Sequence, residues 1–361
     1  MRFLILDTCY PAFLQAHYAR EPGLARRPYD EQWHALMETF FGTADSYSYA
    51  LGRLGHEAHE VVANCAPLQD AWLRERGGRP GPAPFRLRRE RTVLAQAREL
   101  RPDVVYVQNL HVFSRRLLGR LRRDGAMIVG QIASEPPSAG TLRSYDLVVT
   151  SFPHFVDRFR RLGVASEYLG IGFDPRALER LERDGAERER YGAVFVGALN
   201  RTQHRSGNAL LERAARRAPI EFWGYGARGW PPGSPIRSRY HGEAWGIDML
   251  RVLYESRIAL NRHIGAAERF ANNMRLYEAT GVGTLLLTDE KENLGELFEP
   301  GTEVVTYRDE DELVEGVRHF LEDDEARRRI ARAGQQRTLR DYTYLRRMEE
   351  LLAILGESPR R

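Results

Sequence analysis

The fold is best indicated by residues 272–289, which read NNMRLYEATGVGTLLLTD. The pattern predicts a loop, a short helix that begins near Asn273, a tight glycine turn and a buried strand that ends at Asp289. The N-terminus of such a helix presents unpaired N–H groups and a partial positive charge, so it suits a phosphate. Arg275 and Glu278 lie one turn apart on the same face. A carboxylate placed there can accept hydrogen bonds from a pair of sugar hydroxyls, and phosphate together with a polyol indicates a nucleotide-sugar.

Outside this stretch, short apolar runs alternate with longer helical patterns along the chain. Such alternation favours parallel sheets built from βαβ units. The predicted strands are residues 3–6, 58–62, 104–107, 127–131, 147–150 and 167–169, then 193–197, 220–223, 258–261, 284–288 and 303–306. The predicted helices include residues 31–54, 206–217, 247–255 and 310–321.

A length of 361 residues suits two domains of similar size. We expect an α/β protein of two Rossmann-like, doubly wound domains that face a cleft, because ligands of open α/β sheets bind outside the carboxyl ends of the strands. The expected divisions are a first domain at 1–172, a linker at 173–190, a second domain at 191–339, and a terminal helix within 340–361 that packs back on the first domain. The glycine- and proline-rich stretch 77–84 is predicted to be a flexible surface loop.

Composition narrows the class of protein. The chain has only two cysteines, which argues against a disulfide framework or a cysteine metal site. No stretch approaches the roughly 18 apolar residues that cross a bilayer, and the opening MRFLILD resembles a first buried strand more than a secretory signal. We therefore expect a cytoplasmic protein.

Positive charge in this chain is almost entirely arginine, since Lys291 is the only lysine. A net charge of +4 is mild, and the arginine preference favours codon bias over selection for nucleic acid. Weak attraction to anionic membrane surfaces stays open. Any positive group that contacts a phosphate here is expected to be an arginine, which binds bidentately.

In the second domain, the candidate ligand-binding residues follow predicted strands. We expect the donor diphosphate to be bound by Gly197, Arg201, Arg205, Asn272, Asn273 and Arg275. We expect the nucleoside to be bound by Trp223, Gly224, Tyr225, Asn261 and Glu278. Each of the three segments that hold these residues has a structural alternative. The loop after residues 193–197 is alternatively a βα turn with surface arginines, and the loop after residues 220–223 is a tight turn with an aromatic plug. The segment that begins near Asn273 is alternatively a capped helix with an exposed Arg–Glu pair.

In the first domain, the loops after the strands are candidates for acceptor contacts. Three side chains in them are possible general bases: Glu135, His111 and Asp7. Residues 11–30 are predicted to form an unusually long connection, which at a cleft is either functional or a mobile flap.

Residues 269–348 resemble the carboxy-terminal domain of CgeB-like bacterial glycosyltransferases of fold B. The resemblance is carried by NMRLYEA (273–279), GTLLLTD (283–289), LGELFEPG (294–301), EVVTY (303–307), RAGQQR (332–337) and YTY (342–344). Weaker likeness extends to GQIAS (130–134), DLVVTSFPH (146–154) and GFDP (172–175). The first hundred or so residues carry little that can be matched.

The resemblance implies transfer of a sugar from a nucleotide-diphosphate sugar, bound mainly by the second domain, to a hydroxyl acceptor. It implies no cofactor and no essential metal, with Glu278 binding the ribose and Arg201 and Arg205 clamping the phosphates. Many retaining relatives carry an acidic residue eight positions before that glutamate, where this chain has Phe270, while Glu268 is out of register. Retention and inversion therefore both stay open.

The expected partners are a nucleotide-sugar donor and a glycan, lipid-linked or small-molecule acceptor, in the synthesis of bacterial surface glycans or glycoconjugates. Nucleic acid is not expected as a partner. Two alternatives remain: a sugar-nucleotide epimerase or hydrolase of the same fold, and a non-catalytic protein that binds sugar nucleotides.

Overall fold

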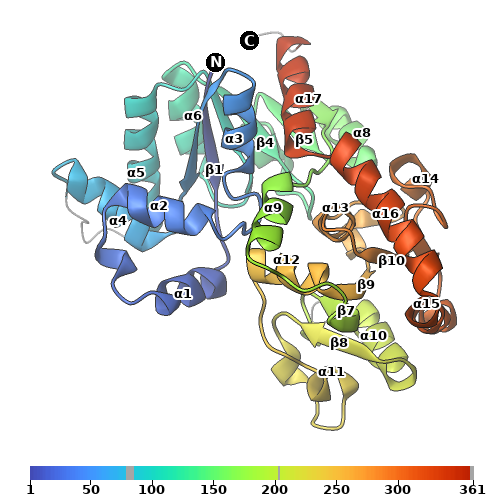
Figure 1. Ribbon diagram of the computed structural model, residues 1–361. Coiled ribbons are helices and arrows are strands. Elements are labelled where there is room, and N and C mark those ends of the chain that lie inside the picture. The colour runs from blue at the N-terminus through green and yellow to red at the C-terminus, as the bar shows by residue number, and fades with distance from the viewer. Residues whose placement is uncertain (79–84, 202–203, 358–361) are drawn as a thin grey trace. The chain divides into compact units, whose positions relative to one another are not determined.

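The computed structural model describes residues 1–78, 85–201 and 204–357, and most of the loop predicted at 77–84 lies outside them. The chain forms two compact units, which are labelled by element in Figure 1. Unit 1 comprises Met1–Gly170 and the chain from Arg347 onward, and unit 2 comprises Ile171–Arg346. Each unit has its own sheet, and every pairing in both sheets is parallel. The predicted fold class, two Rossmann-like α/β domains, is confirmed.

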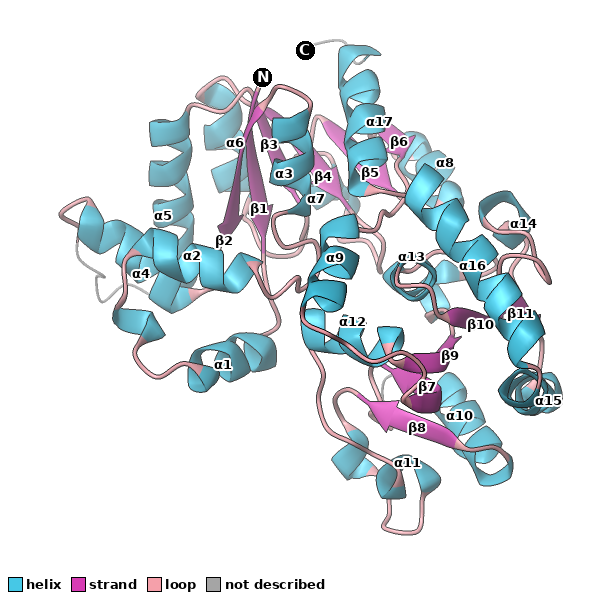
Figure 2. Cartoon of the chain, viewed as in Figure 1, coloured by secondary structure: helices cyan, strands magenta, loops and turns pink. Residues whose placement is uncertain are grey.

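The sheet of unit 1 has six strands in the order β2-β1-β3-β4-β5-β6 (Figure 2). The strands are β1 (Arg2–Asp7), β2 (Glu57–Val62), β3 (Val104–Val107), β4 (Met127–Gln131), β5 (Leu147–Thr150) and β6 (Ser166–Tyr168). Every residue of β3 and β5 is buried, as expected for central strands covered by helices on both faces. The strand order reverses between β1 and β3, and this reversal is the topological switch point of unit 1.

The helices of unit 1 correct two predictions. They are α1 (Pro11–Arg20), the 3-10 turn η1 (Leu24–Arg26), α2 (Tyr29–Met37), α3 (Ser46–Arg53), α4 (Ala66–Glu75), α5 (Phe85–Leu100), α6 (Arg115–Arg123), α7 (Ala139–Leu142), α8 (Pro153–Arg161) and most of α17 (Tyr344–Glu357). The single helix predicted at 31–54 is wrong, because Phe40, Gly42 and Ala44 take positive φ angles of 52°, 63° and 43° and separate α2 from α3. The long connection predicted at 11–30 is also wrong, because Pro11 begins α1 at a position where its missing N–H costs nothing.

The sheet of unit 2 has five strands in the order β11-β10-β9-β7-β8, with a switch point between β7 and β9. The strands are β7 (Tyr191–Val196), β8 (Ile220–Trp223), β9 (Ser256–Asn261), β10 (Leu285–Asp289) and β11 (Val305–Tyr307). All strands predicted in both halves of the chain occur, with ends within two residues of the prediction. Side chains such as Phe195, Leu260 and Leu287 from the sheet pack with Leu211 and Val317 from the helices to form the core.

Helices connect these strands and also occupy the segment predicted as a linker. They are α9 (Pro175–Arg183), α10 (Arg205–Arg217), η2 (Ala227–Gly229), α11 (Pro235–Ser238), α12 (Ile247–Tyr254), η3 (Gly265–Ala267), α13 (Met274–Gly281), α14 (Leu294–Leu297), α15 (Glu310–Glu322) and α16 (Asp324–Asp341). The expected linker, 173–190, lies inside unit 2, where it contains α9. Among the described residues, no helix combines the length and the apolar character that a membrane crossing requires.

Candidate functional site

The first turn of α10 forms one side of a candidate anion site in unit 2. This helix follows β7 at the switch point, where doubly wound sheets bind phosphates at a helix N-terminus. Its first residue is Arg205, and the preceding His204 takes a left-handed conformation (φ 56°) and gives the helix no side-chain cap. The first N–H groups of α10 therefore have no capping side chain.

Arg262, immediately after β9, lies against this helix end. Its guanidinium donates a 2.8 Å hydrogen bond to Asn208 Oδ1, and a Cβ added at Gly207 would collide with it. Burial lowers the pKa of Arg262, against the attraction of Tyr307 and Asp289. Its buried Nε has no hydrogen-bond partner among the described residues. A half-buried cation with an unsatisfied donor beside an uncapped helix N-terminus is suited to an anionic ligand.

The start of helix α13 is hydrogen-bonded to residues at the end of β9. Asn273, near which the helix was predicted to begin, caps it by accepting a hydrogen bond from Leu276 N–H. The Asn273 amide also donates to Asn261 Oδ1 at 2.8 Å and to the Arg262 carbonyl at 3.3 Å. This network fixes the start of α13 to the end of β9. We call the first turns of α10 and α13, together with Arg262, the β7–β9 site.

Arg275 and Glu278 form an ion pair of 3.0 Å within α13, which confirms that they share one helical face. Their side chains are only 13% and 14% exposed, because Arg275 also reaches the Val196 carbonyl and Met249 Sδ, both at 3.1 Å. Burial raises the pKa of Glu278, and the charge of Arg275 opposes that rise. The Arg275 guanidinium is thus already engaged within the fold, whereas Glu278 keeps carboxylate oxygen for hydroxyl donors.

Two predicted nucleoside contacts are occupied by the protein itself. Trp223 stacks on His241 with ring centroids 4.3 Å apart and meets Tyr191 edge-on at 4.9 Å. The Asn261 side-chain amide donates to Thr288 Oγ1 at 2.9 Å and accepts from Asn273. Both side chains are buried, so the structure gives each a packing role.

The glycines of the β7 and β8 loops bring two chain segments together. Gly197 N–H donates to the Trp223 carbonyl, and Leu199 N–H donates to the Tyr225 carbonyl. Gly224 has a φ of 119°, and a Cβ there would overlap the Gly197 carbonyl. Close packing of the two loops therefore explains these glycines without a ligand.

The remaining predicted donor residues differ in their surroundings. Arg201 is exposed and lies 5.7 Å above the Trp230 ring, and Arg205 is exposed at the start of α10. Asn272 is buried, and Tyr225 stacks on Trp245. Residues 202 and 203 of the predicted phosphate loop lie outside the described part of the chain.

His263, which follows β9, and Asp289, the last residue of β10, form a partly buried pair that was not among the predicted site residues. His263 Nδ1 lies 2.7 Å from Asp289 Oδ1, which also accepts the His263 N–H. Burial opposes ionisation of Asp289, but His263 and Lys291 outweigh it, so the pKa of Asp289 is lowered. His263 Nε2 is buried without a partner among the described residues. Arg262 and His263 follow the end of β9, and Asp289 is the end of β10. This position at strand ends is the sequence signal by which all three could have been assigned to the site.

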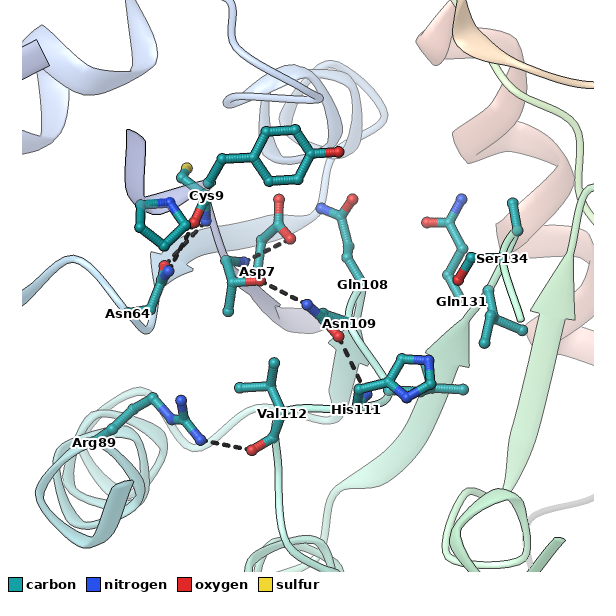
Figure 3. Close-up of a pocket in the computed structure, with 16 residues that line it drawn as sticks. Asp7, Cys9, Asn64, Arg89, Gln108, Asn109, His111, Val112, Gln131 and Ser134 are labelled. Carbon is teal, nitrogen blue, oxygen red and sulfur yellow. Dashed lines mark hydrogen bonds between the residues drawn. The ribbon is translucent and has the colours of Figure 1, made fainter. Parts of the chain in front are cut away.

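Unit 1 has a pocket of about 480 Å³ at its own switch point, which we call the β1–β3 pocket (Figure 3). Its walls are the loops that follow β1, β3 and β4, and two of the three candidate bases, Asp7 and His111, line it. Gln131 Oε1 accepts hydrogen bonds from Tyr47 and Tyr106 at 3.1 and 3.0 Å, which leaves its amide NH₂ as a donor for a ligand. Gln108 exchanges hydrogen bonds with Thr43.

The three candidate bases have different surroundings. Burial raises the pKa of Asp7 from its ordinary value of 3.8 to about 6, while the Thr8 N–H bonded to its carboxylate lowers it. His111 is exposed, and its Nε2 lies 3.0 Å from the Glu135 carbonyl. The Glu135 side chain is exposed and is not part of the pocket wall. Asp7 is the candidate with the environment of a general base.

A family model described as glycosyl transferase-like matches residues 201–353, which include Arg262 and both helices of the β7–β9 site. No curated protein matches the sequence. Among solved structures, HepE of Anabaena in complex with UDP-glucose matches with a TM-score of 0.60 and 15% identity over 99% of each chain. The fold is that of the glycosyltransferases of fold B.

Two further structures show how widely this fold is shared. Sucrose-phosphate synthase from Thermosynechococcus elongatus matches with a TM-score of 0.60 and 11% identity, over 99% of this chain and 98% of that one. A proposed UDP-N-acetylglucosamine 2-epimerase from Listeria monocytogenes matches with a TM-score of 0.53 and 13% identity, over 98% and 95%. At these identities the likeness concerns the fold and leaves the reaction to be argued from the residues.

Proposed function

We propose that this protein transfers a glycosyl group from a nucleotide-diphosphate sugar to a hydroxyl acceptor. The observation that carries the proposal is the glycosyl transferase-like match of residues 201–353, because it coincides with the anion site after β7 and with Glu278. The resemblance of the α13 motifs to CgeB-like enzymes supports the same activity in bacterial glycan or glycoconjugate synthesis.

In this proposal the donor diphosphate lies at the N-terminus of α10, with Arg205 and Arg262 as its cations. Negative charge grows on the β-phosphate as the bond from the sugar C1 breaks, and the partly buried Arg262, together with the exposed Arg205, stabilises that charge. Glu278 accepts hydrogen bonds from the ribose hydroxyls. Arginines and helix ends neutralise the phosphates here, so we expect full activity in the presence of EDTA and no cofactor requirement.

The acceptor binds in the β1–β3 pocket, where Asp7 takes its proton. As the acceptor oxygen bonds to the sugar C1, the hydroxyl proton moves to the Asp7 carboxylate. The C1–oxygen bond to the phosphate breaks, and its electron pair leaves with the nucleoside diphosphate. A carboxyl group with a pKa of about 6 is ionised at neutral pH yet basic enough to accept a proton.

The donor is identified first by binding. Titration calorimetry with UDP, GDP, dTDP, ADP and CMP, followed by their sugars, names the base. UDP is the first to test because the Anabaena structure holds UDP-glucose. Glu278→Ala and Arg262→Gln are expected to weaken binding of the preferred nucleotide at least tenfold, a loss of about 1.4 kcal/mol or more. Undiminished binding in folded forms of both variants contradicts the donor site.

A second candidate is a sugar-nucleotide epimerase or hydrolase, favoured by the fold likeness to the Listeria protein. Such an enzyme consumes the donor without an acceptor. Incubation with the preferred nucleotide-sugar alone, followed by chromatography of the sugar products, separates the two reactions. Donor turnover that is independent of any acceptor supports the second candidate.

A further inference from the structure

Unit 1 contains a second cavity, of about 490 Å³, beside its edge strand β2. This volume falls in the range of about 300–1,000 Å³ that is typical of small-molecule sites. Residues of α2, β2, α4 and α5 form its walls, and these elements lie together on one side of unit 1 in Figure 2. It shares no lining residue with the β1–β3 pocket. We call it the edge cavity.

Gln96 of α5 is an unsatisfied amide in the wall of the edge cavity. Its side chain is 1% exposed, and neither Oε1 nor Nε2 has a hydrogen-bond partner among the described residues. An unpaired buried amide destabilises a protein by about 1–3 kcal/mol, and a leucine of similar size avoids that cost. Both amide atoms are closed off from solvent in this conformation, so a ligand reaches them only when the Gln96 side chain turns into the cavity, and that ligand must offer a donor and an acceptor together.

Trp33 supplies a fixed aromatic surface in the same cavity. Its indole N–H donates a 3.1 Å hydrogen bond to the Glu60 carbonyl on the free edge of β2, which holds the ring in place. The other indole in the wall, Trp72, already has the Arg76 guanidinium 4.2 Å above its ring. Trp33 meets His34 edge-on, with ring centroids 5.0 Å apart, and is the one of the two indoles that a ligand can pack against.

The charges around the edge cavity exclude most other ligands. The acidic residues Asp30, Glu60, Glu75 and Glu99 line it against one arginine, Arg76, which forms two 2.6 Å hydrogen bonds with Glu99. Burial raises the pKa of Glu60 well above its ordinary value, so the negative charge comes from the other three. Excess negative charge disfavours phosphates and sugar acids. An ammonium ligand supplies donors but no acceptor, so it leaves Gln96 Nε2 unpaired. A neutral molecule with adjacent hydroxyl or amide groups meets both requirements.

We propose that the edge cavity binds a neutral saccharide, whose adjacent hydroxyls or N-acetyl group pair with the Gln96 amide while a sugar ring packs on Trp33. The proposal concerns binding alone, so it holds whether or not the β1–β3 pocket supports transfer. For a protein that acts on glycans, such a site holds sugar residues that are not themselves reacting.

The test uses the full chain and three neutral disaccharides: maltose, lactose and N,N′-diacetylchitobiose. Binding is measured by saturation-transfer NMR and titration up to roughly 10 mM, a range that detects millimolar dissociation constants. We expect at least one disaccharide to bind. Gln96→Leu and Trp33→Phe are each expected to weaken that binding about tenfold, since each removes one of the two recognition elements.

Gln69→Leu is the matched control. Gln69 is also a buried glutamine of unit 1, and its Oε1 likewise has no partner among the described residues, but its Nε2 donates to the Val62 carbonyl at 3.1 Å and it does not line the edge cavity. Gln69→Leu is expected to lower the melting temperature and to leave saccharide binding unchanged. Gln96→Leu is expected to keep or raise the melting temperature, because it removes an unsatisfied amide.

Three results overturn the proposal. The first is that none of the three disaccharides binds the wild-type protein. The second is binding that both Gln96→Leu and Trp33→Phe leave unchanged. The third is destabilisation of Gln96→Leu comparable to that of Gln69→Leu, which identifies Gln96 as the partner of a buried water only.

Discussion

Asp7 lies at the carboxyl end of β1, where burial raises its pKa and the hydrogen bond from Thr8 N–H opposes the rise. The folded protein therefore binds the Asp7 proton more tightly than the unfolded chain does. The contribution of Asp7 to stability is fully present below pH 3.8 and is lost as the pH rises through about 6. A charged group kept at the expense of stability is typical of functional sites.

Asp7→Asn is expected to raise the stability of the protein at pH 7 and to abolish most of its activity. The asparagine keeps an oxygen for the Thr8 N–H but has no charge to bury, so we expect a gain of about 3 kcal/mol at pH 7, with no gain below about pH 4. Loss of a general base lowers the rate by about 10²–10⁴-fold. Urea unfolding at pH 4 and pH 7 measures the first effect, and nucleotide release with donor and acceptor measures the second.

Two outcomes separate these effects. Activity within tenfold of wild type means that another group, such as the departing phosphate, accepts the proton. Equal stability of variant and wild type at pH 7 contradicts the raised pKa of Asp7.

At the scale of single residues, local geometry was predictable and long-range contact was not. The cap at Asn273 and the pairing of Arg275 with Glu278 depend on helical spacing, which the sequence shows directly. The packing of Trp223 against His241 joins two separate segments of the chain, so an aromatic beside glycines was interpreted as a nucleobase platform. The orphaned Nε of Arg262 likewise follows from the approach of α10 to β9.

At the scale of elements, the strands were predictable because buried parallel strands are short apolar runs. The helices near the start of the chain were harder. The α2–α3 break depends on left-handed conformations at Phe40 and Ala44, which are not residue types that announce a turn. Pro11 was a usable helix-start signal for α1 that the prediction did not apply.

Helix α10 offers a test of the anion site through Gly207. Alanine favours a helix over glycine by about 1 kcal/mol, so propensity alone predicts that Gly207→Ala stabilises the protein. Its new Cβ would collide with the Arg262 guanidinium and displace it from Asn208. We expect the affinity for the preferred nucleoside diphosphate to fall about tenfold, the loss of roughly one charge-assisted hydrogen bond. Titration calorimetry measures this affinity in the variant and in the wild-type protein.

Gly119→Ala in α6 is the matched control for this substitution. A Cβ at Gly119 meets only the Arg123 guanidinium, at an ordinary contact distance of 4.0 Å. The control is expected to raise stability by up to about 1 kcal/mol and to leave nucleotide affinity unchanged. If the two variants bind nucleotide equally well, Arg262 does not contribute to the site.

At the scale of the whole molecule, each unit has its own parallel sheet, its own buried side chains and its own switch point with polar residues at the strand ends. The alternation of strands and helices was sufficient to predict this two-unit plan. The structural division falls after Gly170, two residues before the end predicted for the first domain.

Since each unit buries its own core, we expect scanning calorimetry to resolve two unfolding transitions, one for each unit. The preferred nucleoside diphosphate, at about 100 times its dissociation constant, stabilises the unit that binds it by about 2.7 kcal/mol. Because the β7–β9 site lies entirely in unit 2, the ligand is expected to raise one transition only. Gly119→Ala lies in unit 1 and is expected to raise the other, which assigns each transition to its unit. A single transition that responds to both changes would show that the two units unfold as one cooperative structure.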